Sequence, residues 1–130
     1  DEGANNIILS NRTKEKANEL KKLFPELEVL DWGKRPPICN IVINTTSIGL
    51  IKDEEIKIDF SDYDKNFHKN FLFYDLIYNP KETDFLKKAR LRGNKTMNGK
   101  MMFLNQAKYA FNIWTNIMPE IDDEVIKLLD

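Results

Sequence analysis

The chain has 130 residues, of which 42% are hydrophobic and 32% charged, and this composition predicts one globular domain with a core of its own. Its formal net charge of -1 and its lack of an apolar run of about 18 residues argue against nucleic acid and membranes as partners. With one cysteine and one histidine, Cys39 and His68, the chain cannot form an internal disulfide or a His/Cys zinc site, so we expect no metal.

Short apolar runs alternate with amphipathic stretches along the first part of the chain. Residues 1–3 are typical of the end of a helix, with Gly3 as its left-handed cap. We then expect a short buried strand at 6–10 and two further strands at 27–30 and 40–44. Between the first two strands, the pattern predicts a helix that Thr13 caps and that extends to about Phe24, where Pro25 ends it.

The second half repeats this alternation after a charged segment, 50–70, in which we expect one short helix around 63–69. A nearly continuous apolar run predicts a buried strand at 70–76, followed by a helix that Thr83 caps and that ends at Gly93. A short edge strand at 95–97, a long helix from Gly99 to about 116 and a terminal helix after Pro119 complete the chain. The long helix carries apolar residues at helical spacing that predict a core-facing stripe, namely Met102, Phe103, Ala107, Ala110, Phe111 and Trp114.

Strands that alternate with helices imply parallel strands joined by right-handed crossovers. We therefore predict an α/β fold, a doubly wound and mainly parallel Rossmann-like sheet with flanking helices, in a single domain over residues 1–130. In such sheets, ligands bind at the carboxyl ends of the strands, where the helices begin.

The first of these junctions favours a phosphate ligand. The strand expected to end at Ser10 is followed by Asn11, Arg12 and Thr13, where NAD-binding sheets have Asp or Glu and NADP-binding sheets an Arg. Arg12 offers a planar fork of donors, Thr13 a hydroxyl at a helix start, and Lys16 a point charge one turn on. This pattern favours NADP over NAD. The alternative is that Thr13 only caps a helix and that Arg12 is an ordinary surface charge.

Two further junctions carry polar residues. The segment at 43–49, Ile-Asn-Thr-Thr-Ser-Ile-Gly, either lets a flat ligand approach the backbone closely or forms an ordinary turn. Tyr78 follows the strand at 70–76 and Gln106 lies on the long helix, where a packing role and a solvent-facing role are the alternatives to ligand binding. Asp75 needs a partner if it is buried, and the sequence does not name that partner.

Taken in order, these segments resemble the C-terminal, cofactor-binding half of shikimate dehydrogenases, the NADP-dependent enzymes of aromatic amino-acid biosynthesis. The resemblance extends from the first residues to at least Trp114 and rests on the order and spacing of short motifs. They are Ser10-Asn-Arg-Thr13 with Lys16-Ala17, Ile43-Asn-Thr-Thr-Ser-Ile-Gly49, Tyr74-Asp-Leu-Ile-Tyr78-Asn-Pro80 with Thr83 and Phe85-Leu86, and then Gly93, Gly99, Met102, Gln106-Ala107, Phe111 and Trp114.

The resemblance implies a role for each motif. The expected site residues are Asn11, Arg12, Thr13 and Lys16 at the adenosine 2′-phosphate, Thr46 and Ser47 along the central part of the cofactor, Leu76, Gly99 and Met102 around the nicotinamide, and Tyr78 and Gln106 at the substrate. The implied reaction is reversible hydride transfer between NADPH and 3-dehydroshikimate, giving shikimate, in a cytoplasmic or plastid-type setting. The protein would bind and orient the reactants while the cofactor supplies the hydride.

Two parts of the family's pattern are not found in this sequence. One is the Gly-rich pyrophosphate loop with its first strand, and the other is the substrate domain with the Lys–Asp pair that transfers protons. We therefore expect part of an enzyme, inactive alone and without a catalytic residue of its own, whose terminal helix at 119–130 is a candidate to pack on the substrate domain. The family's first strand lies between the strands that end at Ser10 and Asn44, so another segment, direct pairing of these two strands, or a partner's strand in a homodimer must fill that place.

Three other interpretations remain open at the level of sequence. The first is a quinate/shikimate dehydrogenase that uses NAD. The second is a non-catalytic nucleotide-binding or regulatory module with the same fold. The third is an interaction domain in which the strand–helix junctions are ordinary turns that bind no nucleotide.

Overall fold

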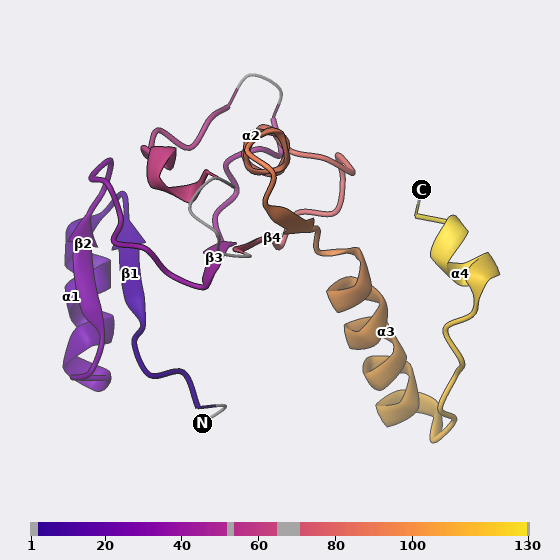
Figure 1. Cartoon of the computed structure of the whole chain (residues 1–130). Helices are drawn as coiled ribbons and strands as arrows, with labels where there is room; N and C mark the ends of the chain where they lie inside the picture. The colour runs from indigo at the N-terminus through magenta and orange to yellow at the C-terminus, as the bar shows by residue number, and fades with distance from the viewer. Residues whose placement is uncertain (1–2, 52–53, 65–70, 130) are drawn as a thin grey trace. The chain divides into compact units, whose positions relative to one another are not determined.

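The structure is a computed structural model that describes residues 3–51, 54–64 and 71–129. The chain divides into two compact units, one made of Asp1–Ile38 with Lys57–Ser61 and the other of Cys39–Ile56 with Asp62–Asp130. The first unit contains β1, α1 and β2, and the second contains β3, β4, α2, β5, α3 and α4 (Figure 1). That residues 1–130 act as one domain stays a prediction.

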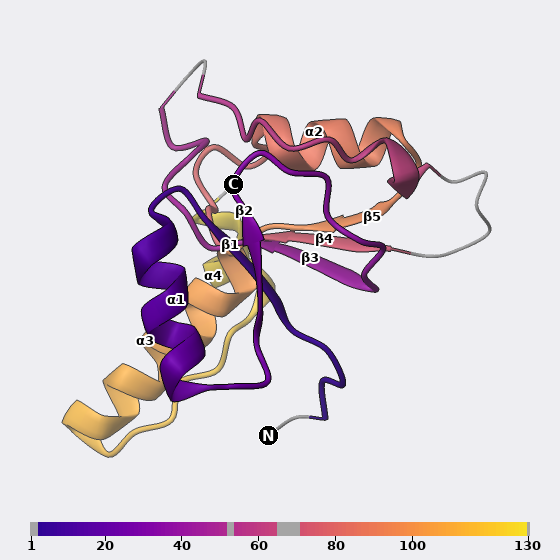
Figure 2. The same cartoon turned by 90° about the vertical axis from the view of Figure 1, so that its left-hand side faces the viewer.

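The first unit is a parallel strand pair covered by one helix. Its elements are β1 (Ile8–Asn11), α1 (Lys14–Leu23) and β2 (Glu28–Asp31). The two strands pair along their whole length and α1 packs against both (Figure 2). The helix starts after Thr13 as predicted, although the Thr13 side chain makes no capping hydrogen bond. Ala17 is its buried residue, at 1% exposure, and fixes the face that meets the strands.

The second unit is built on a three-stranded parallel sheet in the order β3-β4-β5. The strands are β3 (Ile41–Asn44), β4 (Leu72–Asp75) and β5 (Lys95–Met97). Helix α2 (Asp84–Leu91) joins β4 to β5 and lies along the sheet against both of them (Figure 2). The register places the last residue of β3, Asn44, directly opposite the last residue of β4, Asp75. The polar ends of the two strands are therefore neighbours.

The core of this unit is an aromatic cluster that joins the sheet to α2. Tyr63, which is 0% exposed, makes edge contacts with Phe71 and Phe73 at centroid distances of 4.8 and 5.4 Å. Phe73 packs in turn against Phe85 of α2 at 5.4 Å. The Tyr63 hydroxyl accepts a hydrogen bond from the Cys39 backbone N–H at 3.0 Å. Burial raises the pKa of Tyr63 to about 12, because the charged phenolate is disfavoured away from water.

A short 3-10 helix, η1 (Ser61–Tyr63), ends at the residue where a helix around 63–69 was predicted to begin, and Asp64 is not helical. Residues 65–69 of that prediction, His68 included, fall outside the described residues.

Two helices follow the sheet. They are α3 (Lys100–Thr115), which begins after Gly99 as predicted, and α4 (Asp123–Lys127). The prediction of a core-facing stripe on α3 is wrong in this chain, because Phe103, Phe111 and Trp114 are 36%, 43% and 80% exposed. Helical spacing shows that one face of a helix is apolar. It does not show that the same chain supplies the surface that covers this face.

The predicted fold class is confirmed. Every strand pair among the described residues is parallel, and strands and helices follow one another in the predicted order. The boundaries differ from the predictions by one to a few residues, as is usual at element ends. The described strands form one sheet in each unit, β1-β2 in the first and β3-β4-β5 in the second.

Candidate functional site

The junction between β1 and α1 presents cations and a helix start. The Asn11 side-chain amide donates to the Thr13 carbonyl at 2.7 Å and so fixes the turn. Arg12 and Lys16 are exposed, and neither forms an ion pair with any described residue. Since Thr13 makes no capping bond with its side chain, its hydroxyl can serve a ligand together with the backbone N–H groups at the start of α1. This set of donors suits a phosphate.

A third cation of the same junction is already paired. Lys14 Nζ lies 2.6 Å from Asp31 Oδ1, at the end of β2. The pairing raises the pKa of Lys14 and lowers the pKa of Asp31, since each charge favours the other. Lys14 therefore neutralises the carboxylate nearest to it, and Arg12 and Lys16 are left as the cations available to a ligand.

The junction between β4 and α2 is organised around one buried carboxylate. Asp75 is 0% exposed. Its Oδ1 accepts hydrogen bonds from Asn44 Nδ2 and from the Ile77 backbone N–H, both at 3.0 Å. Its Oδ2 accepts from Thr83 Oγ1 at 2.6 Å. A single side chain thus ties together the end of β3, the loop after β4 and the start of α2.

Asn44 extends this network into the loop after β3. Its Oδ1 accepts from the Thr46 backbone N–H at 3.0 Å and from Thr46 Oγ1 at 2.7 Å. Thr46 Oγ1 accepts in turn from the Ile48 N–H at 3.1 Å. The Thr46 hydroxyl is therefore engaged inside the loop, whereas the side chain of exposed Ser47 makes no hydrogen bond within the described part of the chain. Of the two predicted cofactor residues here, Ser47 is the one with a hydroxyl to offer.

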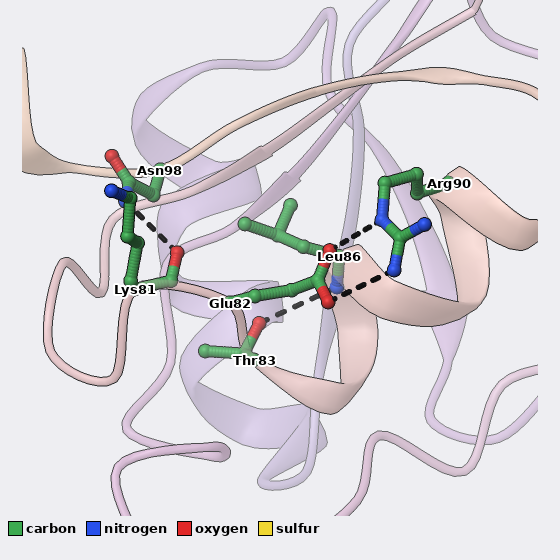
Figure 3. A network of polar contacts seen from close by, with 6 residues as sticks. All are labelled: Lys81, Glu82, Thr83, Leu86, Arg90 and Asn98. Carbon is green, nitrogen blue, oxygen red and sulfur yellow. Dashed lines mark hydrogen bonds and ion pairs between the residues drawn. The ribbon is translucent and has the colours of Figure 1, made fainter.

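The start of α2 is held from several sides, as Figure 3 shows. Thr83 caps the helix as predicted, since its Oγ1 accepts from the Leu86 N–H at 3.4 Å. Glu82 accepts two hydrogen bonds from Arg90, at 2.6 and 3.1 Å, and this contact lowers the pKa of Glu82. The Asn98 side-chain amide donates to the Lys81 carbonyl at 2.9 Å. The loop that leads to α2 is thereby fixed to the segment that leads to α3.

The start of α3 lies directly against the loop after β4. A Cβ atom added to Gly99 would stand 1.9 Å from the Leu76 carbonyl oxygen, so only glycine fits this approach. The Gly99 N–H also donates to the Ile77 carbonyl at 3.1 Å. The ring of Tyr78 stacks on Phe103 of α3, with centroids 4.7 Å apart and an interplanar angle of 24°. The structure therefore brings Leu76, Gly99 and Tyr78 together.

The other two predicted residues lie further along α3. Met102 is half-buried, and Gln106 is exposed with no hydrogen-bond partner among the described residues. Sequence reasoning did not assign Asn44 or Phe103 to the site and left Asp75 without partners. The available signal was a carboxylate closing an apolar strand, with a helix-capping Thr eight residues later.

Within the described ranges, no group of three His, Cys, Asp or Glu side chains is placed to hold a metal ion. None of the helices there is long and apolar enough to cross a membrane.

Comparison with known proteins places the chain in a family. No protein-family model matches it. It is, however, 52% identical over 124 residues to the shikimate dehydrogenase (NADP(+)) of Pelagibacter ubique, a match that covers 95% of this chain and 45% of that protein. The chain belongs to the shikimate dehydrogenase family. It spans about half the length of the curated relatives that it matches.

Solved structures agree with this assignment. A shikimate dehydrogenase in complex with NADP+ matches with a TM-score of 0.77 and 34% identity, over 95% of this chain and 45% of that one. The 5-ketofructose reductase of a Gluconobacter strain matches with a TM-score of 0.80 and 30% identity, over 98% of this chain and 47% of that one. The architecture of this shikimate dehydrogenase family member is therefore shared with reductases that carry other names.

Proposed function

We propose that this chain forms the NADP-binding part of a shikimate dehydrogenase, which reversibly reduces 3-dehydroshikimate to shikimate in aromatic amino-acid biosynthesis. The observation that carries the proposal is the 52% identity to the Pelagibacter ubique enzyme, sustained over 95% of the chain. We assign no catalytic residue to the chain itself, because none of its residues matches the family's Lys–Asp pair. A substrate domain, as in the family, would supply the proton transfer.

The β1–α1 junction fits the 2′-phosphate that distinguishes NADP from NAD. Arg12 and Lys16 are exposed and unpaired within the described structure, and Thr13 adds a hydroxyl at the helix start. Arg matches phosphate oxygens with two parallel donors, and Asn11 shapes the turn that presents it. When bound, NADPH supplies the hydride. The residues of the first unit would select the cofactor by its extra phosphate.

The second unit offers groups suited to the other parts of the reactants. Ser47 would donate its hydroxyl to the central part of the cofactor, on a loop that Thr46 shapes. Gly99, which carries no side chain, and the Leu76 segment would flank the nicotinamide, with Met102 beside it. The Tyr78 hydroxyl and the Gln106 amide can each donate and accept, which suits the hydroxyl groups of shikimate.

The cofactor assignment is tested by titrating the 130-residue chain with NADP+ and with NAD+. We expect NADP+ to bind about tenfold more tightly or better, since a charge-assisted phosphate contact contributes about 1.5–3 kcal/mol. Arg12→Ala should abolish this preference. Lys21→Ala removes an exposed cation from the last turn of the same helix and is the matched control. A folded chain that binds neither nucleotide would contradict the proposal.

The activity is tested in a chimera, in which this chain replaces the matching 124 residues of the Pelagibacter ubique enzyme. We expect NADP-dependent oxidation of shikimate. Gln106→Ala should lower kcat/KM for shikimate about tenfold or more, as expected when a substrate hydroxyl loses its partner, and should leave the KM for NADP unchanged. A well-folded chimera that binds NADP but does not turn over would favour a non-catalytic nucleotide-binding module.

The match to a 5-ketofructose reductase, with a TM-score of 0.80, supports a second candidate, an oxidoreductase with another hydroxylated carbonyl substrate. Placing the chain in that enzyme as well separates the two. If each chimera acts on the substrate of its host with equal efficiency, the substrate is chosen outside this chain. If shikimate alone is turned over well, Tyr78 and Gln106 contribute to its choice.

The proposal also covers assembly and location. We propose a cytoplasmic enzyme that acts on small molecules, with homodimerisation as one way to cover its strand edges. β1 and β3 each lie at the edge of their sheet, where free backbone groups can pair with another strand. Analytical ultracentrifugation of the chain and cell fractionation test these two points.

A further inference from the structure

We infer that Asp75 is a positioning residue. One of its carboxylate oxygens holds the loop after β3, which carries Ser47 (the Ser47 loop), in a fixed position relative to the loop after β4, which carries Tyr78 (the Tyr78 loop). The inference rests on the proposed function, which gives these loops the cofactor and the substrate. Asp75 itself touches neither reactant in this scheme, because its side chain is 0% exposed.

The two oxygens of Asp75 have different partners. Oδ1 serves the loops, since it accepts from Asn44 Nδ2 and from the Ile77 N–H, both at 3.0 Å. Oδ2 serves the helix, since it accepts from Thr83 Oγ1 at 2.6 Å. Only a group with two acceptor atoms and no donor can meet all three contacts without reorienting a partner. An amide at this position would turn its NH₂ group towards either the loops or the Thr83 hydroxyl.

The loop after β3 depends on Asp75 through one relay. Asn44 is 3% exposed, and its Nδ2 donates to Asp75 Oδ1 while its Oδ1 accepts from the Thr46 N–H and hydroxyl. Thr46 then accepts from the Ile48 N–H on the far side of Ser47. The backbone on both sides of Ser47 is therefore fixed by a chain of hydrogen bonds that starts at the carboxylate.

The loop after β4 depends on the same oxygen directly. The Ile77 N–H that Oδ1 accepts belongs to the residue between Leu76 and Tyr78, and the Ile77 carbonyl accepts from the Gly99 N–H at 3.1 Å. Because these groups are buried, water cannot replace a lost partner without a local rearrangement, and the loss is costly. Loosening Oδ1 should therefore disturb both loops, whereas loosening Oδ2 should disturb α2 alone.

The experiment compares two variants of the full chain, each of which removes one donor to Asp75 together with the contacts that the same side chain makes elsewhere. Asn44→Ala removes the hydrogen bond that links Asp75 to the Ser47 loop. Thr83→Val removes the hydrogen bond that links Asp75 to the start of α2 and keeps the side-chain shape. Hydrogen exchange is followed at the amides of Thr46, Ile48 and Ile77, with the amides of β4 as the reference for global opening. Thermal unfolding and NADP+ titration accompany it.

We expect Asn44→Ala to speed exchange at Thr46 and Ile48 about tenfold or more over the reference, as for a lost part-buried hydrogen bond, and to weaken NADP+ binding. Ile77, which keeps its own bond to Asp75, should stay protected. Thr83→Val should lower Tm but leave all three amides at the reference rate. Asp75→Ala should release all three amides. Asp75→Asn should resemble Thr83→Val, because an amide loses fewer contacts when its oxygen keeps the two donors at the Oδ1 position and its NH₂ group faces Thr83.

The inference is overturned if Asn44→Ala and Thr83→Val change the three amides alike, or if exchange rises uniformly along the chain. That outcome would make Asp75 an ordinary buried polar residue. If the variants show the expected exchange pattern but the wild-type chain binds no NADP+, the proposed function is overturned and the fixing of the two loops stands.

Discussion

The two strand–helix junctions with the clearest polar residues differ in what those residues bind. After β4, Asp75 and Thr83 are buried, and their hydrogen bonds run inward to the protein. After β1, Arg12 and Lys16 are exposed and make no ion pair within the described structure. A buried polar group without a partner costs about 1–3 kcal/mol, whereas a solvated cation costs nothing until a ligand arrives. The junction after β4 is therefore fixed by its own hydrogen bonds, and we call it the closed junction. The junction after β1 keeps its cations available to an anion, and we call it the open junction.

The sharpest test of the closed junction is Gly99→Ala. The added Cβ would lie 1.9 Å from the Leu76 carbonyl oxygen and 2.5 Å from its carbon, and backbone atoms cannot rotate away as a side chain can. We expect a loss of about 3 kcal/mol in the free energy of unfolding, typical of severe overpacking, and a weaker affinity for NADP+. Chemical denaturation and cofactor titration measure the two effects.

Gly3→Ala is the control for this substitution. Gly3 has a φ of +78° and nothing within 4 Å of an added Cβ, so its replacement carries conformational strain without a clash. We expect a loss of about 1 kcal/mol and unchanged affinity for NADP+. If both variants lost the same stability, the close approach of α3 to the loop after β4 would not be what fixes Gly99.

A smaller effect is expected from Tyr63→Phe, in the aromatic core of the second unit. Loss of the acceptor for the Cys39 N–H should cost about 1 kcal/mol at neutral pH. Burial raises the pKa of Tyr63 from 10.0 to about 12, so the unfolded chain releases this proton first. The wild type should therefore lose stability as the pH rises from 10 towards 12, with a slope of about one proton that the variant lacks.

Denaturant unfolding at a series of pH values between 8 and 12 checks this difference. Tyr109→Phe, at a residue that is 60% exposed, is the matched control and should change stability little. Equal slopes for wild type and Tyr63→Phe would show that the Tyr63 hydroxyl is not held in a water-excluded core.

Local patterns predicted most of the elements. The Thr83 cap, the strand at 95–97 and the helix start at Gly99 are each encoded by neighbouring residues, and the structure has all three. The exposed face of α3 was not predictable, because burial depends on a covering surface that no periodicity specifies. The same limit applies to α1, where Leu23 is 72% exposed although it lies on the apolar side of the helix.

The candidate site shows a similar division. Arg12, Thr13 and Lys16 could be proposed as a phosphate site from the sequence, because their cationic and hydroxyl groups lie within five residues of one another after a strand. The partners of Asp75 could not, since Asn44 lies 31 residues earlier and meets it only through the register of β3 and β4. Candidate ligand-binding groups that are neighbours in sequence can be proposed from the sequence alone. Pairs of buried groups that are distant in sequence can be identified only once the fold is known.

The open junction is tested by comparing Lys16→Ala with Lys14→Ala. Both residues are exposed cations near the start of α1, but Lys14 already lies 2.6 Å from Asp31. Lys16→Ala should weaken NADP+ binding about threefold or more, as for one exposed charge on a phosphate, and more strongly at low salt.

The control is Lys14→Ala, which removes a cation but also leaves Asp31 unneutralised. Its effect on NADP+ affinity therefore comes from repulsion by Asp31 and should be rescued by Asp31→Asn. Lys16→Ala should not be rescued in this way. If Asp31→Asn restored the NADP+ affinity of both variants equally, the cations would act only through the net charge of the junction. In that case Lys16 would make no specific contact with the ligand.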